Sequence, residues 1–134
     1  AALQAIRVLL DPADIVVNLL PLTPDTRGLF DRQRFGAWRR GVDFVNLARG
    51  AQVVEADLLA ALDSGQVGRA VLDVFHTEPL PADHAFWRHP KITVTPHGSA
   101  RTLREESIAQ IAGKIRAMEQ GLPIAGVVDP VRGY

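Results

Sequence analysis

Three short apolar segments recur at a regular spacing along the chain. They begin at residues 14, 42 and 70 and cover Asp14–Leu20, Val42–Leu47 and Ala70–Phe75. Each is a run of β-branched and aliphatic residues, which is typical of a strand buried on both faces of a parallel sheet. Their spacing is the length of one strand plus its crossover. We therefore predict an α/β fold with a parallel sheet and right-handed crossovers.

Helix signals lie between these strands. Residues 54–65 carry an apolar face and end at Gly65, a residue suited to a helix C-terminus. They predict a crossover helix whose buried face contains Leu58, Leu59 and Leu62. After the first strand, Thr23 followed by Pro24 predicts an N-cap and a short helix. Asp31 is a second candidate N-cap, for a helical segment over 32–38.

The C-terminal part of the chain adds one strand and one helix. Ile92–Thr95 predicts a short fourth strand. Thr102 and Glu105 have the spacing of a capping box, which predicts a long amphipathic helix that ends at Gly121. Its apolar stripe comprises Ile108, Ile111, Ala112, Ile115 and Met118. We expect the tail, residues 122–134, to be extended.

Composition excludes several classes of protein. Hydrophobic residues make up 47% of the 134 residues and charged residues 22%, so a packed core is expected. Fifteen basic residues balance fifteen acidic ones, which argues against nucleic acid or a membrane as a partner. The absence of Cys excludes disulfides and thiolate metal sites, we expect no metal, and the composition is compatible with the cytoplasm. The longest apolar run, residues 15–22, is far too short to cross a bilayer.

Ligands of open parallel sheets bind at the carboxyl ends of the strands. The segments after the four predicted strands therefore carry the candidate functional residues, and they include one Arg, two acids and one His: Arg49, Asp73, Glu78 and His97. Taken singly, each residue type has an ordinary explanation, such as a surface charge, a local cap or a turn residue. Their occurrence together at one edge predicts a site.

The residue types at this edge suit one kind of chemistry. Arg49 offers a planar, permanently charged fork that can hold a carboxylate. A Glu78 within hydrogen-bonding reach of His97 would fix the tautomer of the imidazole and favour its protonated form. Such a set meets the needs of reducing a 2-keto acid to a 2-hydroxy acid, in which a cofactor delivers hydride and an imidazolium protonates the oxygen.

Three ordered motifs carry a family resemblance. Asn46–Gly50 reads N-x-x-R-G, residues 73–79 read D-V-F-x-x-E-P, and residues 95–97 read T-P-H. Together they resemble the cofactor-domain half of the D-isomer-specific 2-hydroxyacid dehydrogenases. Within that family the chain is most similar to the glyoxylate/hydroxypyruvate reductase A group, through residues 19–26, 53–62 and 128–134. The resemblance covers residues 13–134.

The resemblance implies a role for individual residues. It implies that Arg49, Glu78 and His97 are catalytic. It also implies that the cofactor-binding residues are Pro21, Thr26, Leu47, Ala48, Arg49, Asp73, His97 and Gly98. The implied cofactor is NAD(P)H, with NADPH favoured, and the implied substrate is a small 2-keto acid such as glyoxylate or hydroxypyruvate. A cytoplasmic homodimer is implied for the full-length protein.

The chain departs from the family pattern in two ways. Many members read P-H-I-G-S-A, whereas residues 96–100 here read P-H-G-S-A, one residue shorter. None of the 11 Gly residues forms the G-x-G-x-x-G turn that holds a pyrophosphate, and the family's substrate domain is also missing. We therefore expect residues 1–134 to be the C-terminal part of an NAD(P)-binding domain, the second half of a Rossmann-type sheet, with Ala1 to Leu10 remaining from a preceding helix and loop. The isolated chain is expected to be inactive.

Two alternatives stay open. One is another dehydrogenase of the same superfamily, such as phosphoglycerate, phosphite or formate dehydrogenase, although formate enzymes have Gln where Glu78 stands. The other is a non-catalytic NAD(P)-sensing module, because related domains serve as transcriptional corepressors. The complete set of Arg49, Glu78 and His97 favours an enzyme.

Overall fold

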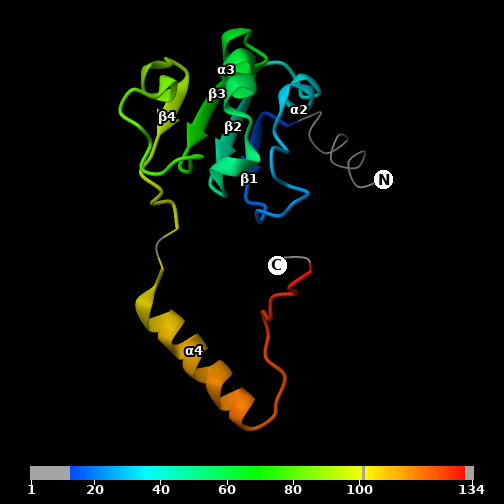
Figure 1. Cartoon of the computed structure of the whole chain (residues 1–134), viewed down its shortest axis with the longest axis vertical. Coiled ribbons are helices and arrows are strands. Elements are labelled where there is room, and N and C mark those ends of the chain that lie inside the picture. Colours follow the sequence, from blue (N-terminus) through cyan, green and yellow to red (C-terminus); the bar gives the residue numbers. More distant parts are fainter. Residues whose placement is uncertain (1–12, 101, 132–134) are drawn as a thin grey trace. The chain divides into compact units, whose positions relative to one another are not determined.

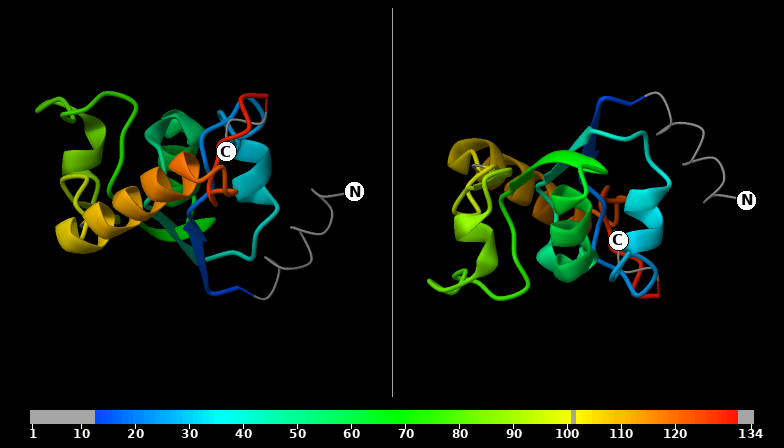
Figure 2. Two further views of the ribbon diagram at one scale, coloured as in Figure 1. Left: turned by 90° about the horizontal axis from the view of Figure 1, so that it is seen from below. Right: turned by 90° about the horizontal axis from the view of Figure 1, so that it is seen from above.

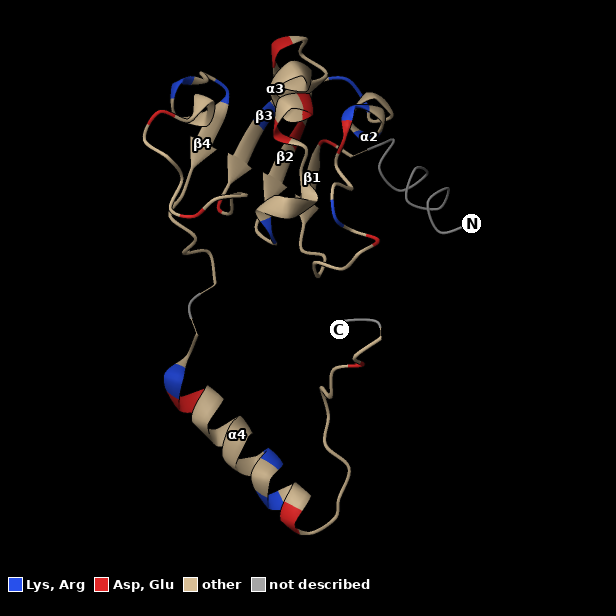
Figure 3. Ribbon diagram, viewed as in Figure 1, with Lys and Arg blue, Asp and Glu red and all other residues tan. Residues whose placement is uncertain are grey.

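The computed structural model describes residues 13–100 and 102–131. The helix and loop predicted for Ala1 to Leu10 lie outside the described residues. The chain divides into two compact units, residues 1–99 and residues 100–134, and the first contains the whole sheet. Figure 3 shows basic and acidic residues interspersed along the helices and loops of the first unit.

The first unit is built on a parallel sheet of four strands in sequence order (Figure 1). The strands are β1 (Ile15–Asn18), β2 (Val42–Asn46), β3 (Val67–Leu72) and β4 (Ile92–Val94). β1 pairs with β2 in unbroken register from Ile15↔Asp43 to Asn18↔Asn46. The α/β fold and the parallel sheet predicted from the sequence are therefore confirmed.

The third strand begins earlier than its apolar pattern predicts. β3 starts at Val67 and ends at Leu72, whereas the predicted segment was 70–75. Gly68 and the exposed Arg69 interrupt the apolar pattern at the start of β3. A side chain at Gly68 would have its Cβ 2.5 Å from the Gly41 carbonyl oxygen, so the strand needs a glycine there. Residues 73–75 leave the sheet and belong to the loop that follows it.

Helices α2 (Arg32–Gly36) and α3 (Glu55–Asp63) cover one face of the sheet (Figures 1 and 2). Short 3-10 helices follow β2 and precede β4: η1 (Gly50–Gln52) and η2 (Ala85–Arg88). The core under α2 and α3 contains an aromatic cluster of Phe30, Phe35, Trp38 and Phe44 together with Leu58, Leu62 and Leu72. The predicted crossover helix over 54–65 is confirmed, and Gly65 follows it with a φ of +73°.

One face of β1 is more exposed than a fully buried strand would be. Val16 and Asn18 are buried, but Ile15 and Val17 are 59% and 49% exposed. The prediction of burial on both faces is therefore wrong for this strand. The physical reason is that α2 and α3, the two α-helices described in the first unit, pack against the face that contains Val16 and Asn18.

The segment after β1 is a turn and not the short helix predicted from Thr23 and Pro24. The N–H groups of Thr26 and Arg27 both donate to the Thr23 carbonyl oxygen, at 3.1 and 3.0 Å, and no helix continues from this turn. Asp31 is the N-cap of α2, because its carboxylate accepts a hydrogen bond from Arg34 N at 2.8 Å. Only the second of the two predicted caps starts a helix.

The second unit contains helix α4 (Arg104–Glu119), followed by a tail without helix or strand over 122–131. The long helix is confirmed, but the capping box of Thr102 and Glu105 is wrong. The N-cap is Leu103, one residue later than predicted, and it makes no side-chain capping hydrogen bond. The predicted apolar stripe is exposed except at the half-buried Ala112, with Ile111 at 58% and Met118 at 63%.

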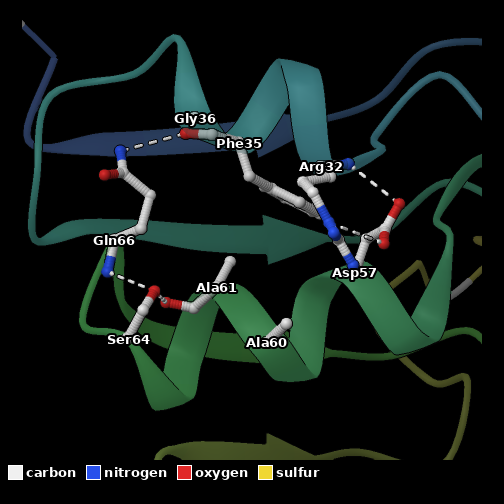
Figure 4. Close-up of a pocket in the computed structure, with 8 residues that line it drawn as sticks. All are labelled: Arg32, Phe35, Gly36, Asp57, Ala60, Ala61, Ser64 and Gln66. Atoms are coloured by element: carbon white, nitrogen blue, oxygen red, sulfur yellow. Dashed lines mark hydrogen bonds and ion pairs between the residues drawn. The ribbon is translucent and has the colours of Figure 1, made fainter.

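A shallow groove of about 310 Å³ lies between α2 and α3 (Figure 4). It is lined by Arg32, Phe35, Gly36, Asp57, Ala60, Ala61, Ser64 and Gln66. None of the predicted site residues belongs to it. No helix among the described residues is long and apolar enough to cross a membrane.

Candidate active site

The loops after the four strands meet at the carboxyl edge of the sheet. This follows from the parallel topology, because all four strands end at the same edge. Buried amide side chains hold the first two loops together. Asn46 at the end of β2 is 1% exposed, accepts a hydrogen bond from Ala48 N at 3.2 Å and donates one to the Arg49 carbonyl oxygen at 3.2 Å. The first residue of N-x-x-R-G therefore fixes the turn that carries Arg49.

The glycine of the same motif permits close packing of two loops. A Cβ at Gly50 would lie 2.0 Å from the Phe75 carbonyl carbon and 2.5 Å from His76 N. No side chain fits at that distance, so the backbone after Arg49 packs directly on the loop after β3. This contact brings the Arg49 turn next to the loop that carries Glu78.

Glu78 and His97 form a hydrogen-bonded pair at this edge. Nδ1 of His97 lies 2.7 Å from Oε2 of Glu78, and Oε1 of Glu78 accepts a hydrogen bond from Phe75 N at 2.9 Å. The two side chains are 48% and 36% exposed, so both are accessible from solvent. The structure thus brings together two of the three residues whose catalytic role the resemblance implies.

The charge of Glu78 is stabilised by its neighbours. The hydrogen bond from His97 holds the pKa of the Glu78 carboxyl below its usual value, and the hydrogen bond from Phe75 N–H and the charge of Arg49 act in the same direction against desolvation. An ionised Glu78 accepts from Nδ1–H of His97. Nε2 is then the ring nitrogen that can hold or release a proton toward a ligand.

Asp73 holds the turn that presents His97. Asp73 is 1% exposed and its carboxylate accepts hydrogen bonds from Thr95 Oγ1, from Gly98 N at 3.1 Å and from Ser99 N at 3.0 Å. Burial raises the pKa of Asp73, but these hydrogen bonds outweigh burial and hold it well below its usual value. Asp73 is therefore an anion that fixes both ends of the turn.

The backbone of this turn is unusual at its central residue. His97 has a φ of 50°, in the left-handed region that non-glycine residues rarely adopt. The turn is one residue shorter than the P-H-I-G-S-A pattern, and the N–H groups of Gly98 and Ser99 both point to the Asp73 carboxylate. The carboxylate of Asp73 thus holds the strained turn in place.

Two threonines close a turn within the loop after β1. Oγ1 of Thr26 donates to the Pro21 carbonyl oxygen at 2.7 Å and accepts from Thr23 N at 2.8 Å. Pro21 is exposed, Thr26 is half-buried, and on the neighbouring turn Leu47 is half-buried and Ala48 buried. This loop and the neighbouring turn thus place the exposed residues Pro21 and Arg49 at the carboxyl edge.

Arg49 is the third residue with an implied catalytic role. It is exposed, its Nη1 donates to the Ala48 carbonyl oxygen at 2.6 Å, and its charge acts on Glu78. The carboxyl edge of the sheet therefore carries the Arg49 cation and the imidazole–carboxylate pair of His97 and Glu78. The chemistry of these side chains fits a nicotinamide ring and a small keto acid. None of the described residues has a buried polar side-chain atom without a partner, and they contain no group of three His, Asp or Glu suited to a metal.

Two buried residues of this site were missed from the sequence. Asn18 and Gln52 are 2% and 0% exposed, and Asn18 Nδ2 donates to both Gln52 Oε1 and Asn46 Oδ1. The signal for Asn18 is an amide inside an apolar run. Gln52 gives no comparable signal, because a Gln near a helix start is ordinarily solvated.

These loops, their motifs and the sheet define the class of the chain. The family described as "D-isomer specific 2-hydroxyacid dehydrogenase, NAD binding domain" matches residues 2–99. The chain belongs to this family, and the sheet is the Rossmann-like fold of its solved members.

Similar proteins include two reductases from bacteria. The glyoxylate/hydroxypyruvate reductase A of Serratia proteamaculans is 52% identical over 125 residues, which are 93% of this chain and 40% of the relative. That of Yersinia enterocolitica is 48% identical over 120 residues, 90% of this chain and 38% of the relative. The chain thus spans about two fifths of the length of these curated relatives.

Two solved structures are also similar to this chain. A D-isomer specific 2-hydroxyacid dehydrogenase from Xanthobacter autotrophicus, in complex with NADPH and MES, has a TM-score of 0.93 at 45% identity, covering 98% of this chain and 55% of that one. An NADPH-dependent glyoxylate/hydroxypyruvate reductase from Sinorhizobium meliloti, in complex with NADP and sulfate, has a TM-score of 0.92 at 42% identity, covering 98% and 43%.

Proposed function

We propose that this chain is the C-terminal part of the NAD(P)-binding domain of a reductase that converts glyoxylate, hydroxypyruvate or a related small 2-keto acid to the 2-hydroxy acid. The observation that carries the proposal is the His97–Glu78 pair, with 2.7 Å between Nδ1 and Oε2, on the same edge as Arg49. The two reductases described above, near 50% identity, support the choice of substrate.

Each residue of the site has one task in the proposed reaction. Arg49 binds the carboxylate of the keto acid and polarises the neighbouring carbonyl. Glu78 holds His97 through Nδ1 and stabilises its protonated form. Nε2 of His97 then donates a proton to the carbonyl oxygen while hydride reaches the carbonyl carbon. Because Glu78 stays ionised, the imidazole takes its next proton from solvent, to which His97 is 48% exposed.

The proposed cofactor is NAD(P)H, with NADPH favoured, and it would supply the hydride. The two solved relatives described above contain NADPH or NADP. In this chain the residues proposed to line the nicotinamide and its ribose are Pro21, Thr26, Leu47, Ala48, Arg49, Asp73, His97 and Gly98. For Asp73 the contact is indirect, since its carboxylate is occupied by Thr95, Gly98 and Ser99.

We also propose a cytoplasmic homodimer for the full-length reductase. The exposed apolar residues of β1 and α4 are surface that a larger assembly would cover, which supports association. The absence of Cys is compatible with a reducing compartment. Light scattering of the purified full-length protein measures the mass and tests the dimer.

The activity is tested by following NADPH absorbance with the full-length reductase. We expect oxidation of NADPH with glyoxylate and hydroxypyruvate, and a raised KM for the keto acid in Arg49→Ala, because the variant lacks the carboxylate-binding group. Arg69→Ala, on the exposed part of β3, is the matched control and should behave as wild type. Activity with phosphoglycerate or phosphite alone, or NADPH binding without turnover, would replace this proposal by another dehydrogenase or by a sensing module.

A further inference from the structure

Gln52 uses every hydrogen-bonding position of its side-chain amide although it is 0% exposed. Its Nε2 donates to the carbonyl oxygens of Leu20 and Pro21, each at 3.1 Å. Its Oε1 accepts from Asn18 Nδ2 at 2.8 Å and from Arg49 N at 3.2 Å. An amide offers two donors and two acceptor positions, so this one is fully used.

These four bonds join the end of β1 and the loop after it to the turn after β2, and a backbone hydrogen bond from Gly28 N to the Ala51 carbonyl oxygen also links that loop to η1. Leu20 and Pro21 follow β1, whereas Arg49 is the N-cap of η1 after β2. Gln52 lies 32 and 31 residues along the chain from the two carbonyl groups that it binds. Asn18 completes the connection, because its Nδ2 also donates to Asn46 Oδ1 at 2.9 Å and its Oδ1 accepts from Leu20 N at 3.1 Å. The buried side chain of Gln52 therefore ties the start of the loop after β1 directly to the Arg49 backbone, in addition to the backbone hydrogen bond from Leu47 N to the Asn18 carbonyl oxygen at 3.2 Å.

We propose that Gln52 is a positioning residue of the active site. It holds the Pro21 loop, on the proposed cofactor side, at a fixed distance from the backbone of Arg49, on the keto acid side. This inference rests on the proposed function and extends it by naming a buried side chain that ties the two binding loops together. Gln52 itself touches neither substrate nor cofactor, since its amide is occupied inside the protein.

The chain contains a matched control at another place in the fold. Gln66 Nε2 donates to the Phe35 carbonyl oxygen at 3.0 Å (Figure 4). It also donates to the Trp38 carbonyl oxygen at 2.8 Å. Gln66 thus also ties a loop through two backbone carbonyls, but it precedes β3 and lines the groove between α2 and α3. Loss of either glutamine removes hydrogen bonds of the same kind, and only Gln52 joins the two loops of the site.

The experiment compares Gln52→Leu with Gln66→Leu in the full-length reductase. We expect kcat/KM to fall about 10- to 100-fold in Gln52→Leu, because small misplacements of binding groups have effects of that order. The KM values for the keto acid and for NADPH should both rise. Gln66→Leu should keep near wild-type kinetic constants although its thermal stability falls. Equal kinetic losses in the two variants, or none in Gln52→Leu, would overturn the proposal.

A second variant keeps the test decisive if Gln52→Leu does not fold. Gln52→Glu keeps acceptors for Asn18 Nδ2 and Arg49 N but has no N–H to donate to Leu20 and Pro21. It should raise the KM for NADPH more than the KM for the keto acid. A rise of the keto acid KM alone would contradict the assignment of the Pro21 loop to the cofactor side.

Hydrogen exchange separates this proposal from the proposed function. In the folded protein the Arg49 amide should exchange faster in Gln52→Leu than in wild type, and should stay protected in Gln66→Leu. If wild-type enzyme reduced no keto acid, the proposed function would fail, and the positioning role would then be decided by this exchange. Unchanged protection of the Arg49 amide in Gln52→Leu would overturn it.

Discussion

Two carboxyl groups at the carboxyl edge of the sheet, those of Glu78 and Asp73, have pKa values below their ordinary values. Their hydrogen-bond partners differ. Glu78 is 36% exposed and pairs with His97, whereas Asp73 is 1% exposed and accepts hydrogen bonds from the turn that carries His97. The first carboxylate therefore acts on the imidazole and the second on its backbone. Substitutions at the two positions should be distinguishable, because one changes the pH dependence of activity and the other the stability of the fold.

Asp73→Asn should lower the free energy of unfolding by about 1–3 kcal/mol, because a buried charged acceptor of several hydrogen bonds is lost. The sign of the pH dependence follows from the lowered pKa of Asp73. A carboxyl whose pKa is depressed by folding contributes stability above its unfolded value, and that contribution is lost as pH falls below the ordinary 3.8. Urea titrations at neutral pH and near pH 3 should show a smaller acid-induced loss in Asp73→Asn than in wild type. An identical loss would contradict the role of Asp73.

Glu78→Gln should move the basic limb of the kcat/KM profile to lower pH. The amide keeps a hydrogen-bonding group beside Nδ1 but removes the negative charge that stabilises the imidazolium. Glu55→Gln is the matched control, because Glu55 pairs with His84 at 3.3 Å outside the proposed site. A profile that moved equally in both variants, or in neither, would leave Glu78 as a turn residue only.

At the scale of elements, close approach of η1 to the loop after β3 decides the shape of the site. Gly50→Ala places a Cβ 2.0 Å from the Phe75 carbonyl carbon, so one loop must move. We expect a loss of about 1–3 kcal/mol in the free energy of unfolding, as for other overpacking changes, together with a lower kcat/KM. Gly36→Ala in α2 meets no atom within 4 Å and should be neutral or stabilising. Urea denaturation of both variants tests this, and an undisturbed Gly50→Ala would contradict the contact.

The elements that were predicted well are those whose burial pattern is local. β2, α2 and α3 follow from an apolar run, an N-cap and an apolar helix face, each contained within a few residues. β3 was misplaced because Gly68 meets the carbonyl of Gly41, a contact set by tertiary packing. The Thr23 segment has the composition of a helix start, but the hydroxyl of Thr26 closes a turn there.

For the site, sequence motifs predicted which residues meet but not what holds them. Glu78 and His97 could be paired because both follow parallel strands. The hydrogen bonds of Asp73 to Gly98 and Ser99 depend on a turn conformation with a positive φ at His97, which composition does not specify. Gln52 could not be found because three of its four partners lie 31 to 34 residues before it in the chain.

At the scale of the whole molecule, we expect this chain to carry only part of a cofactor site. It has no G-x-G-x-x-G turn, and it matches 40% of the Serratia relative. We therefore expect that the isolated 134-residue chain gives no detectable heat on calorimetric titration with NADPH, whereas the full-length reductase binds it. Micromolar binding by the isolated chain, about −8 kcal/mol, would show that the cofactor has been misplaced.

The central claim is that His97 donates the proton in keto acid reduction. The most direct measurement is the single-turnover rate of glyoxylate reduction by full-length wild type and His97→Asn, with saturating NADPH and with thermal unfolding recorded for both. The account predicts a rate lower by ~10²–10⁴-fold in His97→Asn, the usual contribution of a general acid, with an unfolding temperature close to that of wild type. A single-turnover rate equal to that of wild type in a folded His97→Asn protein would contradict it.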